Sequence, residues 1–185
     1  MESTSGHVFW LFGLSGAGKS TLSIALQRAL NETPGTAALL LDGDRLREGL
    51  CRGLGFSDLD RTENLRRAAE VARLGVESGL VVIAAFITPL ETQRRMVESI
   101  VGRDSISLVY LAAALDVCRR RDVKGLYGRA AAGGVEKMTG VSSTFDAAQA
   151  CDLRIETGAE SIEGSTGKLV EFARGRLGKR RRVSG

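Results

Sequence analysis

Apolar runs and amphipathic segments alternate along this chain, and that alternation constrains the fold more than any other feature. Apolar runs that predict strands cover residues 8–12, 37–41, 80–86, 107–111 and 153–155. Helical patterns cover residues 19–30, 62–78, 90–101 and 162–176. Because the first three runs are almost continuously apolar, they are typical of parallel strands that are covered on both faces. The pattern therefore predicts a three-layer α/β/α sandwich with a mainly parallel sheet.

The chain has 185 residues, enough for one such domain, which we assign to residues 1–178. Residues 122–150 break the alternation and are rich in glycine, alanine and charge, so we predict a mobile lid there. Residues 179–185 form a basic tail that we expect to be disordered. Four side chains of this tail account for the whole formal charge of +4, so residues 1–178 have no net charge. A neutral body argues against a nucleic-acid partner.

Apolar length and the counts of cysteine and histidine exclude several classes of protein. The longest apolar stretch, residues 80–87, is far shorter than the roughly 20 residues that cross a bilayer, so we expect no membrane partner. The three cysteines include no C-x-x-C pair, which indicates neither a disulfide framework nor a zinc site and favours a cytoplasmic location. His7 is the only histidine, which argues against a multi-histidine metal site or a Ser-His-Asp triad.

Residues 13–20 read GLSGAGKS and match the phosphate-loop pattern G-x-x-x-x-G-K-[ST], between a predicted strand and a predicted helix. In such a loop, glycines let backbone N–H groups surround phosphates at the positive end of the helix. We predict that Lys19 reaches the β- and γ-phosphates and acts in catalysis, and that the Ser20 hydroxyl ligates Mg²⁺. The residues predicted to bind ATP here are Gly13, Ser15, Gly16, Ala17, Gly18, Lys19, Ser20 and Thr21.

Asp42, Gly43 and Asp44 follow the second predicted strand, at the end where open α/β sheets build their sites. One carboxylate can hold Mg²⁺ directly or through water, and the other can accept a proton from an attacking hydroxyl. We expect Gly43 to let the backbone turn sharply, so that both carboxylates face one crevice. An ordinary Asp-Gly turn is the alternative interpretation.

The next helix pattern opens with a predicted capping box, in which Asp60 is the N-cap residue and Glu63 its partner. Arg61 and Asn64 are three residues apart and therefore share one face, which is polar, unlike the apolar stripe of this helix. Together with Arg47, Arg61 suits an anionic group such as phosphate or sulfate.

Phe56 lies between these two arginines in the sequence and is a candidate to stack on the ring of a substrate. A core phenylalanine is the alternative for Phe56, and surface salt bridges are the alternative for the arginines. The phosphate loop itself does not identify the acceptor, because GTPase switches, ATPase motors and small-molecule kinases share it.

Five segments stand in the order found in adenylyl-sulfate (APS) kinases, namely residues 42–47, 54–57, 60–67, 85–89 and 121–127. With the phosphate loop they extend over about residues 8–157, and the chain therefore resembles this family. The resemblance implies a P-loop kinase that uses Mg²⁺ and transfers the γ-phosphate of ATP to the ribose 3′-hydroxyl of adenosine 5′-phosphosulfate (APS). The products would be PAPS and ADP, in sulfate assimilation. The resemblance also implies a homodimer.

The resemblance further implies roles for individual residues. Asp44 resembles the catalytic base, with Asp42 beside it near the metal and the substrate. Further residues that resemble substrate contacts are Arg47, Phe56, Arg61, Asn64, Ile87 and Lys124. Met138 stands where the family has an aromatic residue that completes an adenine sandwich, and we predict that its sulfur presses on the ring instead. Arg121 joins the lid to its helix and resembles an ATP-binding residue. Thr88 stands where bacterial members have a serine regarded as a phosphorylated intermediate, and we assign it a substrate-lining hydroxyl without an obligatory covalent step.

Two other functions are open at this point. A kinase for gluconate, shikimate or a nucleoside monophosphate would share the phosphate loop, but the two arginines and Phe56 favour a nucleotide with an anionic 5′ group. A catalytically degenerate nucleotide-binding module is the other alternative. The intact phosphate loop and the paired carboxylates argue against it.

Overall fold

Five parallel strands form one sheet in the order β2-β3-β1-β4-β5. The computed structural model describes residues 6–122, 125, 144–146, 148 and 150–183, with side chains up to residue 178. The strands are β1 (His7–Phe12), β2 (Ala38–Asp42), β3 (Val81–Phe86), β4 (Ile106–Leu111) and β5 (Leu153–Ile155). Each lies within a residue or so of its predicted position.

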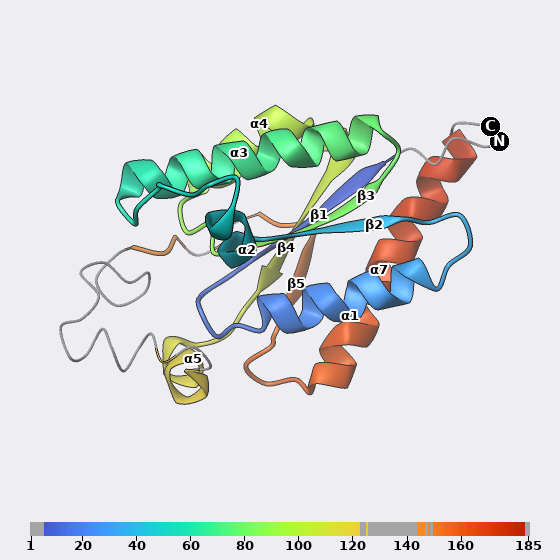
Figure 1. Cartoon of the computed structure of the whole chain (residues 1–185). Helices are drawn as coiled ribbons and strands as arrows, with labels where there is room; N and C mark the ends of the chain where they lie inside the picture. Colours follow the sequence, from blue (N-terminus) through green and yellow to red (C-terminus); the bar gives the residue numbers. More distant parts are fainter. Residues whose placement is uncertain (1–5, 123–124, 126–143, 147, 149, 184–185) are drawn as a thin grey trace.

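Helices cover both faces of this sheet. They are α1 (Lys19–Asn31), α2 (Gly43–Glu48), α3 (Asp58–Glu77), α4 (Glu91–Val101), α5 (Leu115–Arg121) and α7 (Ile162–Val183), with a 3₁₀ turn, η1, at Arg103–Ser105. α3 and α4 pack on one face, and α1 and α7 pack on the other (Figure 1). The predicted three-layer sandwich is therefore confirmed. No helix in the described ranges is long and apolar enough to cross a membrane.

β1 lies at the centre of the sheet, and its alternate side chains fill two separate cores. Phe9 and Leu11 pack with α1 and α7, whereas Trp10 and Phe12 pack with α3 and α4. All four side chains are fully buried, which explains the continuously apolar sequence of this strand. β2 differs from the prediction, because it is an edge strand in which only Leu41 is buried.

α3 begins earlier than predicted, and a different residue caps it. Ser57 is the N-cap residue, since its Oγ accepts from the Asp60 amide at 3.1 Å and donates to the Asp60 carboxylate at 2.6 Å. The prediction of Asp60 as N-cap residue with Glu63 as partner is therefore wrong. Glu63 instead accepts hydrogen bonds from Arg66 and Arg67, which lower the pKa of its carboxyl to about 2.

Three further differences concern short or terminal segments. The backbone of α7 runs to Val183, so the disorder predicted for the tail is wrong for residues 179–183. α2 and α5 are absent from the sequence prediction, because six or seven residues are too few to show helical periodicity. Most of the predicted lid lies outside the described residues, together with Lys124 and Met138.

Candidate active site

The phosphate loop joins β1 to α1 at the carboxyl end of the sheet. Gly13, Gly16 and Gly18 have positive φ angles of 153°, 79° and 95°, and a Cβ on Gly16 would lie 2.9 Å from a backbone oxygen of α5. These φ angles favour glycine at all three positions, and at Gly16 the close approach to α5 also excludes a side chain. Lys19 folds back over the loop, where its Nζ donates to the carbonyl oxygens of Gly13 at 3.0 Å and Leu14 at 2.7 Å.

Two side chains from other parts of the chain donate hydrogen bonds to carbonyl oxygens of this loop. The Thr157 hydroxyl donates to the Ala17 carbonyl at 2.9 Å. Arg121 donates to the Gly16 carbonyl at 3.3 Å and to the Thr157 carbonyl at 2.6 Å. These bonds fix the orientation of two loop peptides, so Arg121, a predicted ATP contact, touches the loop backbone itself. No sequence signal marks Thr157, which reaches the loop only because β5 lies in the same sheet.

The two aspartates lie at the end of β2, beside the start of α1. The Ser20 hydroxyl donates to Asp42 Oδ2 at 3.0 Å, and the Asp44 amide donates to Asp42 Oδ1 at 3.0 Å. Asp42 therefore caps α2, and Asp44 lies exposed in the first turn of that helix. Gly43 is the first residue of α2, so the chain passes directly from β2 into this helix. A Cβ at this position would lie 3.1 Å from the Phe86 ring, which is closer than an ordinary van der Waals contact.

The pair formed by Ser20 and Asp42 fits a magnesium ion by its chemistry. Mg²⁺ takes oxygen ligands and usually keeps waters and substrate phosphates beside one or two protein ligands. Within the described ranges, no group of three or more His, Cys, Asp or Glu side chains could hold a metal.

Phe56 is an exposed ring held between two arginines, with 64% of its surface accessible. The guanidinium carbon lies 4.5 Å from the ring centroid for Arg47 and 6.0 Å for Arg61. Arg47 also donates to the carbonyl oxygens of Leu54 and Gly55, and Arg61 donates to that of Phe56. The alternative of a core phenylalanine is therefore wrong. The ring and both cations form one accessible surface beside α2.

Asn64 lies one turn after Arg61 on α3 and is almost completely buried, with 5% of its surface exposed. Among the described side chains its Oδ1 finds no hydrogen-bond partner. A buried polar atom without a partner is uncommon and calls for an explanation such as a missing ligand or water. Burial lowers the pKa of the neighbouring Arg61, and the nearby charge of Asp58 offsets this only in part.

Thr88 follows β3 with a φ of 42°, which is uncommon for a β-branched residue. Its hydroxyl accepts a hydrogen bond from Trp10 Nε1 at 2.8 Å, and only 1% of the residue is exposed. The neighbouring Ile87 is half-buried, and its carbonyl accepts from the Gly13 amide of the phosphate loop at 3.3 Å. This burial favours a positional role for the Thr88 hydroxyl over a covalent one.

The phosphate loop follows β1, the central parallel strand, and the Asp42 carboxylate at the end of β2 lies beside it. This arrangement defines the class of P-loop nucleotide-binding enzymes. The family model for adenylylsulphate kinase matches residues 5–156. The adenylyl-sulfate kinase of Paraburkholderia xenovorans is 49% identical over 92% of this chain and 94% of its own length. That of Prochlorococcus marinus is 45% identical over 93% of this chain and 89% of its own length. The chain belongs to the adenylyl-sulfate kinase family, whose members are ATP-dependent kinases.

Solved structures agree with this assignment. The Mycobacterium tuberculosis APS kinase CysC in complex with AMPPNP and APS matches with a TM-score of 0.86 at 37% identity. The match covers 92% of this chain and 98% of that one. A gluconokinase from Sinorhizobium meliloti matches with a TM-score of 0.59 at 16% identity, over 97% of this chain and 95% of that one, which shows a shared fold alone.

Proposed function

We propose that this enzyme transfers the γ-phosphoryl group of ATP to the ribose 3′-hydroxyl of APS, which gives PAPS and ADP. The observation that carries the proposal is the exposed Phe56 ring between Arg47 and Arg61, on the segment that directly follows the paired aspartates. An aromatic face can stack on a base, and guanidinium groups match phosphate and sulfate oxygens. Membership of the adenylyl-sulfate kinase family supports the same acceptor.

On the nucleotide side, the phosphate loop surrounds the β- and γ-phosphates with backbone N–H groups at the start of α1. Lys19 exchanges the loop carbonyls for phosphate oxygens. Ser20 and Asp42 are the residues that would hold Mg²⁺, which when bound neutralises charge on the phosphates. Arg121 and Thr157 keep two loop peptides oriented before the nucleotide arrives, which reduces reorganisation on binding.

On the acceptor side, Asp44 acts as the base. Its carboxylate takes the proton of the 3′-hydroxyl while that oxygen attacks the γ-phosphorus and the bond to the ADP oxygen breaks. Arg47 and Arg61 bind the phosphosulfate, and Phe56 stacks on the adenine. The unpaired Oδ1 of Asn64 accepts a hydrogen bond from a donor of the adenosine, since the phosphosulfate oxygens only accept.

Thr88 needs no covalent role in this scheme. Its buried hydroxyl is already bonded to Trp10, and in-line attack delivers the phosphoryl group directly to the acceptor. Ile87 and Thr88 border the acceptor side next to the phosphate loop. Lys124 and Met138 remain predicted substrate contacts outside the described residues.

The test of the proposal is the release of ADP from ATP and Mg²⁺ with one acceptor at a time: APS, gluconate, shikimate, AMP or CMP. We expect turnover with APS and formation of PAPS, identified by mass. Turnover with another acceptor but not with APS would overturn the proposed substrate. Binding of ATP without turnover on any acceptor would instead support a nucleotide-binding module.

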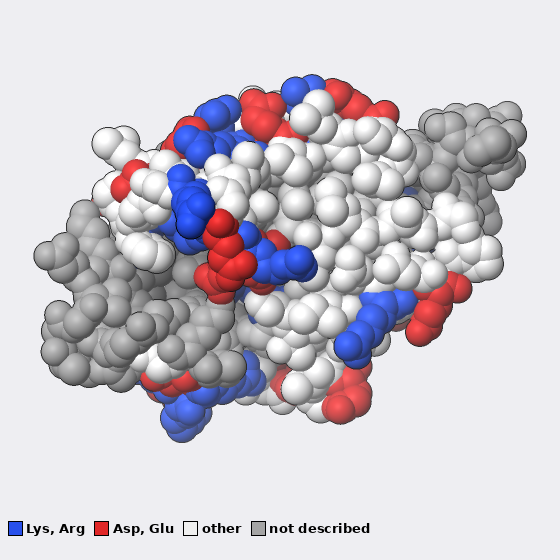
Figure 2. All heavy atoms as spheres, in the orientation of Figure 1, with Lys and Arg blue, Asp and Glu red and all other residues white. Residues whose placement is uncertain are grey.

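The partners, the cellular location and the oligomeric state of the enzyme are also proposals. On the face in Figure 2, acidic and basic side chains lie intermixed over α2 and α3, which supports the expectation of no nucleic-acid partner. The three cysteines are free, which accords with a reducing cytoplasm. We propose a homodimer, to be measured by light scattering, although a relative from Thiobacillus denitrificans, 26% identical, is a hexameric APS kinase.

A further inference from the structure

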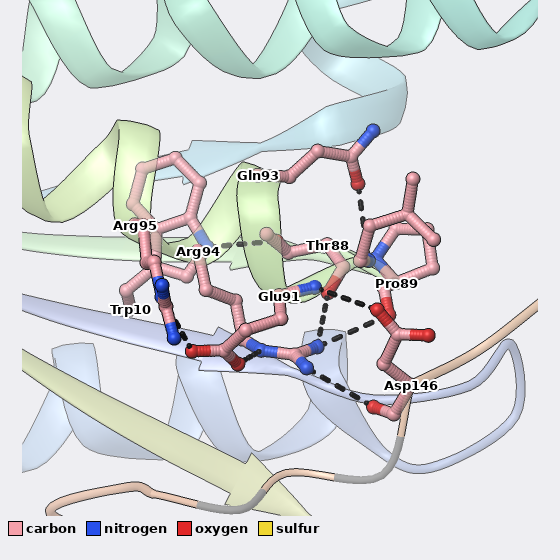
Figure 3. A network of polar contacts seen from close by, with 9 residues as sticks. Trp10, Thr88, Pro89, Glu91, Gln93, Arg94, Arg95 and Asp146 are labelled. Atoms are coloured by element: carbon pink, nitrogen blue, oxygen red, sulfur yellow. Dashed lines mark hydrogen bonds and ion pairs between the residues drawn. The ribbon is translucent and has the colours of Figure 1, made fainter.

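Arg94 of α4 is a buried cation that binds four groups at once. Only 1% of the residue is exposed. Its Nε pairs with Glu91 Oε2 at 3.0 Å, its Nη1 donates to the carbonyl oxygens of Thr88 and Pro89 at 3.1 Å each, and its Nη2 donates to the Asp146 carbonyl at 3.1 Å. Figure 3 shows this guanidinium between the loop after β3 and the returning chain at Asp146.

Asp146 is joined to the same loop by two more bonds. Its amide donates to the Pro89 carbonyl at 2.9 Å, and its Oδ2 accepts from the Glu91 amide at 2.9 Å. Phe145 beside it stacks on Tyr110, with ring centroids 6.0 Å apart. Two segments far apart in the sequence therefore form one hydrogen-bonded unit around Arg94.

The loop held by Arg94 is also the loop that touches the phosphate loop. The Ile87 carbonyl accepts from the Gly13 amide, and the Thr88 hydroxyl accepts from Trp10 Nε1. The φ of 42° at Thr88 is uncommon for a β-branched residue, and a backbone conformation of this kind persists only where the surroundings impose it. Arg94 and Trp10 are the side chains that bind Thr88 from two sides.

A buried arginine is costly unless each of its donors is paired. Here it pairs with one carboxylate and with three carbonyl groups at the place where the chain leaves β3 toward α4. We propose that Arg94 is a positioning residue for the acceptor, because it holds Ile87 and Thr88 against the phosphate loop. This inference rests on the proposed transfer to APS. The nucleotide side is held separately by Arg121 and Thr157.

The chain has one tryptophan, Trp10, so its fluorescence reports directly on the bond to Thr88. The test compares Arg94→Met and Arg94→Lys with the control Arg95→Met. Arg95 is the next residue of α4 and pairs with the other oxygen of the same Glu91 at 3.3 Å, but its side chain is 76% exposed (Figure 3). Steady-state kinetics, Trp10 emission and the thermal midpoint are measured for each.

For Arg94→Met we expect the KM for APS to rise about tenfold or more with a fall in kcat, since small displacements near the reacting groups are costly. The KM for ATP should stay within about twofold, because the phosphate loop keeps its own supports. Trp10 emission of the free enzyme should shift. Arg94→Lys keeps the charge but lacks the planar fork of donors, so its KM for APS should rise less than that of Arg94→Met. Arg95→Met should match the wild type.

Other patterns would overturn the inference. In one, Arg94→Met lowers the thermal midpoint but leaves the Trp10 emission and the KM for APS unchanged. This result would mean that Arg94 has a purely structural role. Another is an equal rise in the KM for ATP and for APS. If Arg94→Met does not fold, the inference requires that Arg94→Lys show a smaller rise in the KM for APS and a smaller shift of Trp10 emission, with the KM for ATP unchanged. If the wild type does not use APS, the proposed function fails, whereas Trp10 emission in the free variants still tests the hold on Thr88.

Discussion

Asp42 and Asp44 are the same residue type two positions apart, but their surroundings differ. Asp42 is half-buried, and its two oxygens accept from the Ser20 hydroxyl and the Asp44 amide. Both carboxylate oxygens of Asp42 are therefore already bonded, one to the helix that follows the phosphate loop and one to the first turn of α2. Asp44 is exposed in the first turn of α2. The bond to Ser20 supports Asp42 as the residue near the metal, and the exposure of Asp44 leaves its side chain accessible to an acceptor.

Asp44→Asn should lower kcat with APS by about 10²- to 10⁴-fold, because the amide cannot take the proton of the 3′-hydroxyl. Affinity for ADP, measured by calorimetry, should change little, since the base acts on the hydroxyl of the acceptor and not on the nucleotide. The control is Asp104→Asn, at an exposed aspartate of η1. Undiminished turnover in Asp44→Asn would remove this residue as the base.

α3 shows what an element-level pattern can and cannot predict. Its apolar spacing predicts the buried face, which contains Leu65, Ala69 and Ala72 as expected. Its start is ambiguous, because Ser57 with Asp60 and Asp60 with Glu63 both have the spacing of a capping box. The path of the chain decides between them, since only Ser57 has the extended backbone of an N-cap residue.

Ser57→Ala should lower the free energy of unfolding by about 1 kcal/mol, because the amide of Asp60 loses its acceptor. Urea denaturation measures the change. Ser78→Ala is the matched control at the other end of α3, where the serine is exposed and donates only to the Leu74 carbonyl. Equal effects of the two substitutions would show that Ser57 does not cap the helix.

At the scale of the whole molecule, Asp152 joins segments that are distant in the sequence. Its carboxylate accepts from the Leu108 amide of β4 at 2.8 Å, from Arg103 of η1 at 3.1 and 3.2 Å, and from Arg176 of α7 at 2.9 Å. The side chain is only 8% exposed. Burial opposes its charge, but the bonds from Arg103 and Leu108 outweigh burial and lower the pKa of Asp152 below 3.8.

Asp152→Asn should lower the free energy of unfolding at pH 7 by about 1–3 kcal/mol, because two partly exposed arginines lose their shared anion. The lowered pKa means that this stabilisation is fully present above the unfolded value near 3.8 and is lost as the pH falls through the folded value. The difference between wild type and variant should therefore shrink in urea titrations below pH 3.8. Asp116→Asn is the control.

Asp116 also pairs with an arginine, at 2.8 Å, but both side chains are exposed, so we expect little change at any pH. A difference between wild type and Asp152→Asn that stayed constant down to the acid transition would contradict the role of the Asp152 charge. In that case packing, rather than the ion pairs, would account for the loss.

The sequence by itself determined the layers, the strands and the phosphate loop, because these depend on local periodicity and on residues that are neighbours in the chain. It also brought the two aspartates to one strand end. Only the tertiary structure decided which side chains support that site. Thr157 reaches Ala17, and Arg94 reaches Asp146, across long sequence separations, and Trp10 of β1 binds Thr88 in the loop after β3. Such contacts have no spacing rule, since they depend on how strands are ordered in the sheet and how helices pack on it.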